Sequence, residues 1–104
     1  MSNWRNSLGE LKDAISYVMA YAPDRFPVED FLPPDGQMNL DRIFAQVRKL
    51  LEEVAKGKGE SSDLAECRDG IEGSYQHYKA GSMDHGFLRI QEVLHILMKV
   101  GKRQ

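Results

Sequence analysis

A carboxylate and an imidazole stand three residues apart in Glu92-x-x-His95, the spacing in this chain most typical of a metal site. On a helix this spacing brings both side chains within reach of one ion. A carboxylate-bridged di-iron site also needs a second such pair and two further glutamates, and the sequence has no second Glu-x-x-His. The pair shares its expected helix face with His85, Leu88 and Lys99, opposite the apolar stripe. We therefore predict a solvated surface here, with no metal centre and no cofactor.

His77 is a second candidate for chemistry, in the stretch from His77 to Gly81. This stretch resembles the phosphoacceptor site of histidine phosphotransfer domains, which are themselves four-helix bundles. In that family a lysine follows the histidine by three residues and a glycine follows it by four. Gly81 matches the pattern, but Lys79 stands one position early. The resemblance implies phosphotransfer at His77 as an alternative function, while the residues favour an ordinary, partly exposed histidine.

Cys67 is the single cysteine of the chain, and it falls on an apolar stripe with Leu64 and Ile71. That position predicts a small buried hydrophobic side chain rather than a nucleophile. One cysteine cannot form an internal disulfide, which suits a reducing compartment. The sequence also lacks a nucleophile elbow, a phosphate-binding glycine loop and a Cys-x-x-Cys pair. We predict no catalytic residue and no enzymatic activity.

Composition narrows the classes of protein further. The 104 residues carry 14 basic and 16 acidic side chains, a formal charge of −2, which is the wrong sign for a protein that neutralises phosphates. No run approaches the roughly 18 apolar residues of a membrane-spanning helix. The chain begins without the basic and apolar regions of a signal peptide. We expect one domain over residues 1–104, a cytoplasmic location, and neither nucleic acid nor membrane as a partner.

Apolar residues recur at spacings of three and four in four segments, the period of amphipathic helices. The pattern predicts helices over about residues 3–22, 39–56, 62–80 and 83–100, and hence an all-α four-helix bundle. The last helix is expected to be central, with a seam from Met83 to Leu97 that has Leu94 in the middle of the core. The direction of the first helix stays open, because sixteen loop residues can span about 50 Å.

Gly70 and Gly73 fall inside the third expected helix, where each costs roughly 1 kcal/mol relative to alanine. They indicate either a kink or a close approach of a neighbouring helix. If the third and fourth helices fold back about Gly81, then Gly73 lies opposite Arg89 and Gly86 lies opposite Gln76. Small residues on both helices would then let the two backbones come close together.

The long connection between the first two helices holds all four prolines and is nevertheless apolar, with Phe26, Val28, Phe31 and Leu32. Two interpretations stand. The apolar side chains close one end of the bundle, or they form an exposed patch with an acidic rim, the composition of a contact site. We expect Phe26 and Phe31 to lie against the core and the flanking acids to contact a partner.

The segment 60–72 carries five acids and one arginine, a net charge of −4. One interpretation is neutralisation by the basic C-terminal residues Lys99, Lys102 and Arg103. The other is an acidic docking surface for a basic partner. The partner-binding candidates from both segments are Asp24, Glu29, Asp30, Phe31, Asp35, Asp63, Glu66 and Asp69.

These observations favour a small cytoplasmic helical protein that acts by binding another protein, one of basic charge. Its size, charge and layout are similar to those of small acidic immunity proteins that neutralise bacterial toxins, and an adaptor would have the same features. The structural alternative is a homodimer or a larger homo-oligomer that buries a face of the last helix or the connection. The remaining alternative is phosphotransfer at His77.

Overall fold

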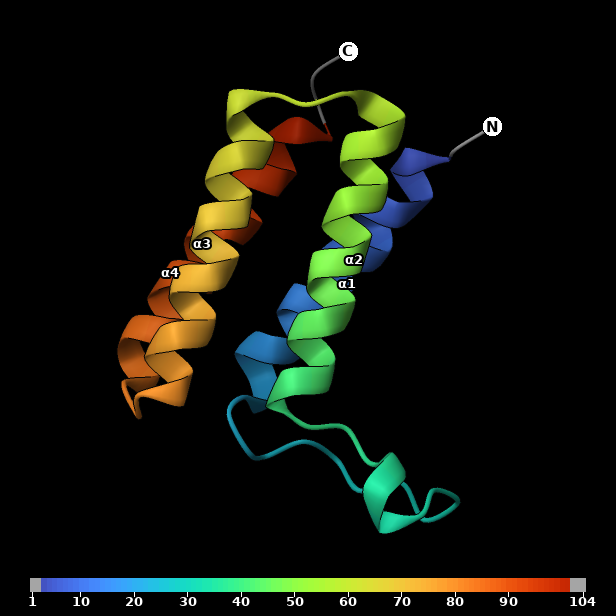
Figure 1. Cartoon of the computed structure of the whole chain (residues 1–104), viewed down its shortest axis with the longest axis vertical. Coiled ribbons are helices and arrows are strands. Elements are labelled where there is room, and N and C mark those ends of the chain that lie inside the picture. Colours follow the sequence, from blue (N-terminus) through green and yellow to red (C-terminus); the bar gives the residue numbers. More distant parts are fainter. Residues whose placement is uncertain (1–2, 102–104) are drawn as a thin grey trace.

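A computed structural model of the chain describes residues 3–101 and contains four α-helices (Figure 1). They are α1 (Trp4–Tyr21), α2 (Leu40–Lys58), α3 (Ser62–Lys79) and α4 (Met83–Val100), with a short 3-10 turn, η1 (Pro34–Gly36), in the long connection. Within these residues there is no strand. The predicted all-α four-helix bundle is confirmed, and the helix bounds differ from the expected ones by two residues at most.

Local sequence signals account for most of the helix ends. The side chain of Asn39 accepts a hydrogen bond of 2.9 Å from the Arg42 N–H and begins α2, and Ser61 caps α3 in the same way. Gly59, at φ 100°, ends α2. Ser82 precedes α4, but its side chain makes no capping bond, and its N–H donates to the His77 carbonyl at the end of α3.

The four helices run alternately up and down the bundle (Figure 1). Each helix packs on its two neighbours in the order α1, α2, α3, α4 and back to α1, and the largest contacts lie within the α1–α2 and α3–α4 hairpins. The open question about the first helix is thus resolved, because α1 is antiparallel to α2. The long connection and the α3–α4 turn lie at one end of the bundle, and the α2–α3 connection lies at the other.

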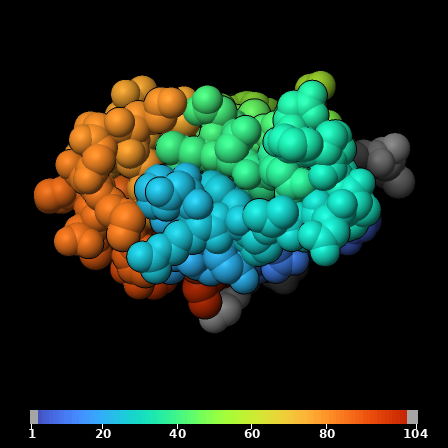
Figure 2. All heavy atoms as spheres, turned by 90° about the horizontal axis from the view of Figure 1, so that it is seen from below, coloured from blue at the N-terminus to red at the C-terminus, as the bar shows by residue number. Residues whose placement is uncertain are grey.

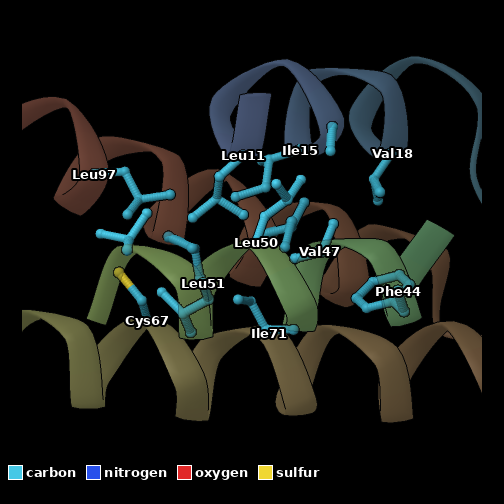
Figure 3. Packing of buried hydrophobic residues seen from close by; sticks show 14 of the residues in the cluster. Leu11, Ile15, Val18, Phe44, Val47, Leu50, Leu51, Cys67, Ile71 and Leu97 are labelled. Atoms are coloured by element: carbon cyan, nitrogen blue, oxygen red, sulfur yellow. The ribbon is translucent and has the colours of Figure 1, made fainter. Parts of the chain in front are cut away.

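The core is one cluster of buried apolar side chains contributed by all four helices. Figure 3 shows Leu11 and Ile15 of α1 meeting Val47, Leu50 and Leu51 of α2, with side chains of α3 and α4 on the flanks. Phe44 is the largest fully buried side chain, and its ring contacts those of two tyrosines of α3. Burial of these side chains from water is the main stabilising contribution.

The buried face of α4 is rotated from the one that its periodicity predicts. Leu94 is half-buried, and Met83 and Phe87 are 49% and 37% exposed, so the expectation that these three residues form the seam is wrong. The buried residues of α4 are Gly86, Ile90, Val93, Leu97 and Val100. The cause is the close contact with α3, which sets the rotation of α4 about its axis.

Glycines make that contact possible. A Cβ added to Gly70 would lie 2.5 Å from a methyl group of Val93, and a Cβ added to Gly86 would lie 2.8 Å from the ring of Tyr78. Gly73 faces the Arg89 side chain, as the fold-back about Gly81 predicts. Because α3 is continuous from Ser62 to Lys79, close packing and not a kink explains its internal glycines.

Candidate partner-binding surface

The connection between α1 and α2 extends beyond the end of the helices (Figure 1). Phe26 is packed against the core as expected, and so is Met38 at the end of the connection. The Phe26 ring stacks on that of Tyr17, with 5.7 Å between the ring centres and 18° between the planes. The end of the bundle is therefore closed by Phe26 and the tyrosine beneath it.

Phe31 is exposed, and the expectation that it lies against the core is wrong. Its exposed fraction is 80%, that of Val28 is 76%, and that of Leu32 is 36%. The Leu32 N–H donates a 3.0 Å hydrogen bond to the Glu29 carbonyl and closes a four-residue turn. Phe31 is the third residue of this turn. With the end of the bundle already covered by Phe26, the turn carries Phe31 into solvent.

Gln37 holds this turn in place through its side-chain amide. The amide oxygen accepts from the Glu29 N–H at 2.8 Å, and the amide nitrogen donates to the carbonyls of Glu29 and Leu32 at 2.8 and 2.9 Å. Arg42, on the first turn of α2, donates to the Asp35 carbonyl. The exposed aromatic ring therefore stands on a hydrogen-bonded scaffold, and we call residues 28–37 with these bonds the Phe31 turn.

Three of the predicted acids belong to the Phe31 turn, and a fourth, Asp24, precedes it in the connection. Asp24, Glu29, Asp30 and Asp35 are all exposed, and with Arg25 they give residues 23–39 a formal charge of −3. Burial raises the pKa of the Tyr17 hydroxyl, and the nearby Glu29 charge raises it further. Figure 2 views the molecule from this end, where the connection, in cyan to teal, covers a large part of the surface.

The predicted acids of α3 do not join this surface. Asp63 and Glu66 lie on the first turns of α3, at the far end of the bundle from the Phe31 turn (Figure 1). Glu66 and Asp69 are exposed and line a groove between α3 and α4 that also contains Arg89 and Glu92. Asp63 is half-buried and makes contacts of its own. The two candidate surfaces are therefore separate.

Two arginines pair with two of the remaining acids of segment 60–72, Glu60 and Glu72. Arg68 binds Glu52 at 2.9 Å and Glu60 at 2.7 Å, and Arg48 binds Glu72. Lys99 makes no ion pair with the residues that the structure describes, while Lys102 and Arg103 lie outside them. The ion pairs of Arg48 with Glu72 and of Arg68 with Glu52 join α2 to α3. Part of the acidic charge of this region therefore stabilises the packing of the two helices.

The residues that the sequence suggests for chemistry are Cys67, Glu92, His95 and His77, and they lie apart from the Phe31 turn. Cys67 is fully buried, and burial raises the pKa of its thiol to about 12, so the reactive thiolate is not formed at neutral pH. Glu92 and His95 are exposed, and Glu92 lies 3.8 Å from Arg89. Among residues 3–101 no three His, Cys, Asp or Glu side chains are grouped so as to hold a metal ion. His77 is half-buried beside the ring of His85.

Two features of these sites were not expected from the sequence. Gln37 carries no local signal for its role, because an amide that bonds backbone groups five to eight residues away depends on the folded loop. The His77–His85 pair did have a signal, since both residues are four positions from Gly81. The same fold-back that places Gly73 opposite Arg89 also places these two imidazoles opposite each other.

Comparisons with family models, with curated proteins and with solved structures found no match for this chain. None of the helices in residues 3–101 combines the length and the apolar character that crossing a bilayer requires. The Phe31 turn is therefore a candidate surface on the evidence of this structure alone.

Proposed function

We propose that this chain is a protein-binding module and that the Phe31 turn is its contact surface. The observation that carries the proposal is an 80% exposed aromatic ring on a turn that is closed by several hydrogen bonds. Leaving a phenylalanine in water gains nothing for folding, and aromatic side chains are enriched in the centres of interfaces. An ordered turn also loses little conformational freedom on binding, which favours affinity.

The partner suited to this surface has an apolar pocket for one aromatic ring and a basic rim. The pocket would cover Phe31 together with Val28, both of which are largely exposed. Basic side chains around it would meet Glu29, Asp30 and Asp35, and such complementary charges speed association. Neutralisation of a toxin and service as an adaptor are both compatible with this chemistry. These roles, and a cytoplasmic location, stay predictions.

Site-specific photo-crosslinking tests the proposal. The chain is produced with benzoylphenylalanine at position 31 and, as a matched control, at position 45, where Ala45 is exposed on α2. Each is irradiated in an extract of the native host. We expect a discrete adduct from position 31 alone, which excess unlabelled wild-type chain suppresses and excess Phe31→Ala chain does not. Adducts of equal yield from both positions, or none from position 31, would overturn the proposal.

Once the adduct is identified, affinity and stability can be separated. Because Phe31 lies outside the core, Phe31→Ala should change the free energy of unfolding by less than about 0.5 kcal/mol. Its affinity for the captured protein should fall by about 2 kcal/mol or more. The triple variant that neutralises Glu29, Asp30 and Asp35 should associate more slowly at low salt, and equal rates would remove the acids from the docking surface.

Self-association is a second candidate, favoured by apolar side chains exposed along α4. Met83, Leu88 and Met98 are 49%, 53% and 47% exposed, and Met83 and Phe87 line a hollow against the end of α1. Sedimentation over a hundredfold range of concentration tests it. A dimer that Leu88→Glu dissociates would support it, and a monomer throughout would exclude it.

Phosphotransfer stays an alternative, tested by incubation with a phosphorylated receiver domain, which should leave His77 unmodified.

A further inference from the structure

Two histidines face each other across the α3–α4 turn. His77 lies in the last turn of α3 and His85 in the first turn of α4, and their ring centres are 5.3 Å apart with 30° between the planes. His85 is exposed and His77 is half-buried, so water reaches the pair. The sequence motif around His77 draws attention to that residue alone, whereas the structure presents it as half of a pair.

The hairpin holds the backbones of both histidines in place. The Ser82 N–H donates to the His77 carbonyl at 2.8 Å, and Gly81, at φ 85°, makes the reversal that this bond requires. Next to His85, the Gly86 carbonyl accepts a 2.7 Å hydrogen bond from the buried Ser74 hydroxyl. The Tyr78 ring packs directly on Gly86. The two histidines are therefore carried by one tightly packed unit, not by a loose loop.

The separation of the rings is that of two imidazoles that share one ion. With a metal–nitrogen bond of about 2.05 Å and tetrahedral angles, the centres of two ligating imidazoles lie roughly 5.2 Å apart. The observed 5.3 Å agrees with this distance. The angle between the planes is not restrictive, because each ring can rotate about its metal–nitrogen bond. Only side-chain rotations are then needed to direct one nitrogen of each ring at the ion.

The nitrogens of both rings are available as ligands. Neither imidazole makes a hydrogen bond or an ion pair with residues 3–101. Neutral imidazole is a favoured ligand of zinc, copper and nickel, whereas magnesium and calcium prefer oxygen ligands. Because the described residues offer no third protein ligand nearby, the other positions around an ion would be filled by water or by an exchangeable ligand.

We propose that His77 and His85 form a two-histidine site for late divalent transition ions such as Zn²⁺, Ni²⁺ or Cu²⁺. The site is separate from the Phe31 turn, because the two histidines flank the α3–α4 turn and the Phe31 turn lies between α1 and α2. Binding would bridge α3 to α4 and stabilise the folded chain, since the unfolded chain does not hold the two rings together.

Calorimetric titration of the full chain with Zn²⁺ and with Ni²⁺ tests the site, with Mg²⁺ as the hard-ion control. We expect one ion per chain, and a loss of affinity of at least about tenfold in His77→Gln and in His85→Gln, since each leaves one ligand without its partner. His95→Gln is the matched control, because His95 is a solitary exposed histidine on α4. Its affinity should equal that of wild type.

Two further measurements keep the inference falsifiable. Thermal unfolding should shift upward by a few degrees in excess Zn²⁺ for wild type and for His95→Gln, and should not shift for the two site variants. Histidine side-chain NMR should show the nitrogens of His77 and His85 perturbed together by the ion. No binding of Zn²⁺ or Ni²⁺ by wild type, an unchanged affinity in either site variant, or an equal loss in His95→Gln would overturn the proposal.

Discussion

At the scale of single residues, burial decides what a reactive group can do. Cys67 is fully buried, and this raises the pKa of its thiol from its ordinary 9.0 to about 12. A thiol in such a place behaves as a small apolar side chain. Phe31 illustrates the opposite case, because its ring is 80% exposed and contributes nothing to the core.

The shifted pKa of Cys67 predicts how stability depends on alkaline pH. Above pH 9 the unfolded thiol loses its proton while the folded one keeps it, so the unfolded state binds fewer protons and stability falls as pH rises. The slope for this group approaches about 1.4 kcal/mol per pH unit, and it ends near the folded pKa of about 12.

Chemical unfolding at pH 8, 9 and 10 measures this slope. The comparison stays at or below pH 10 because burial also raises the pKa of Tyr78, whose hydroxyl contributes at higher pH. The Cys67→Ala variant, measured in parallel, should be less stable overall but should lose less stability between pH 9 and 10. Parallel curves for the two proteins would show that this thiol is not protonated more strongly in the folded state.

At the scale of the elements, contact with α3 sets the rotation of α4. Leu97 is fully buried and Leu94 is half-buried, although both belong to the same apolar repeat. Leu97→Ala should cost about 2–5 kcal/mol, as expected for a leucine in a tightly packed core. Leu94→Ala should cost roughly 1 kcal/mol, because much of its side chain already contacts water.

Urea unfolding of the two leucine variants checks the rotation directly. The difference in the free energy of unfolding between them is the informative quantity, since both lose the same atoms. A larger loss for Leu94→Ala than for Leu97→Ala would mean that α4 buries the face predicted from periodicity alone.

Two glycine substitutions, one inside the α3–α4 contact and one in α1 away from it, should have opposite effects on stability. In Gly86→Ala the new methyl group would lie 2.8–2.9 Å from atoms of the Tyr78 ring, so the ring or one of the helices must shift, at a cost of about 1–3 kcal/mol. In Gly9→Ala nothing outside the local helix backbone lies within 4 Å of the new methyl group. Alanine should stabilise α1 by roughly 0.5–1 kcal/mol there.

Thermal and urea unfolding of both glycine variants measure these changes. Gly9→Ala serves as the control for helix propensity, which favours alanine at both sites. If Gly86→Ala were as stable as wild type, the helices would be farther apart than in this structure.

At the scale of the whole molecule, the α1–α2 and α3–α4 hairpins pack together through two contacts, α1 against α4 and α2 against α3. We call the ion pairs at the second contact the charged seam. Arg48 and Glu72, and Arg68 and Glu52, pair across the outer edge of the α2–α3 contact. All four side chains are partly exposed, so each pair contributes modestly. The seam adds to an apolar contact beneath it, to which Leu51 and Ile71 contribute.

Removal of Arg68 tests the seam because this side chain holds Glu52 and Glu60 at once. Arg68→Gln should lower the free energy of unfolding by about 0.5–1 kcal/mol at low salt. The loss should shrink in 1 M sodium chloride, where exposed charges are screened. Lys49→Gln is the matched control, since Lys49 is exposed and makes no ion pair with the described residues. An equal loss for both variants at low salt would make net charge, and not pairing, the cause.

The amino-acid sequence by itself determined the four helices, their ends and most of the core. These properties are local: the spacing of apolar residues, a cap such as Asn39 and a stop such as Gly59 act within a few residues. The fold-back of α3 on α4 was predictable for the same reason, because a short turn about Gly81 leaves only one arrangement. Composition also identified the acids and Phe31 as candidates for contact.

Only the tertiary structure decided which way α1 runs, how α4 is rotated and whether Phe31 lies inside or outside. The long connection is compatible with either direction of α1, so packing of whole helix faces selects it. Phe26 and Phe31 have the same side chain in the same connection, but their exposure differs. Phe26 already covers the Tyr17 ring at the end of the bundle, and Phe31 is left exposed. Such outcomes depend on contacts between residues far apart in sequence, which no local pattern contains.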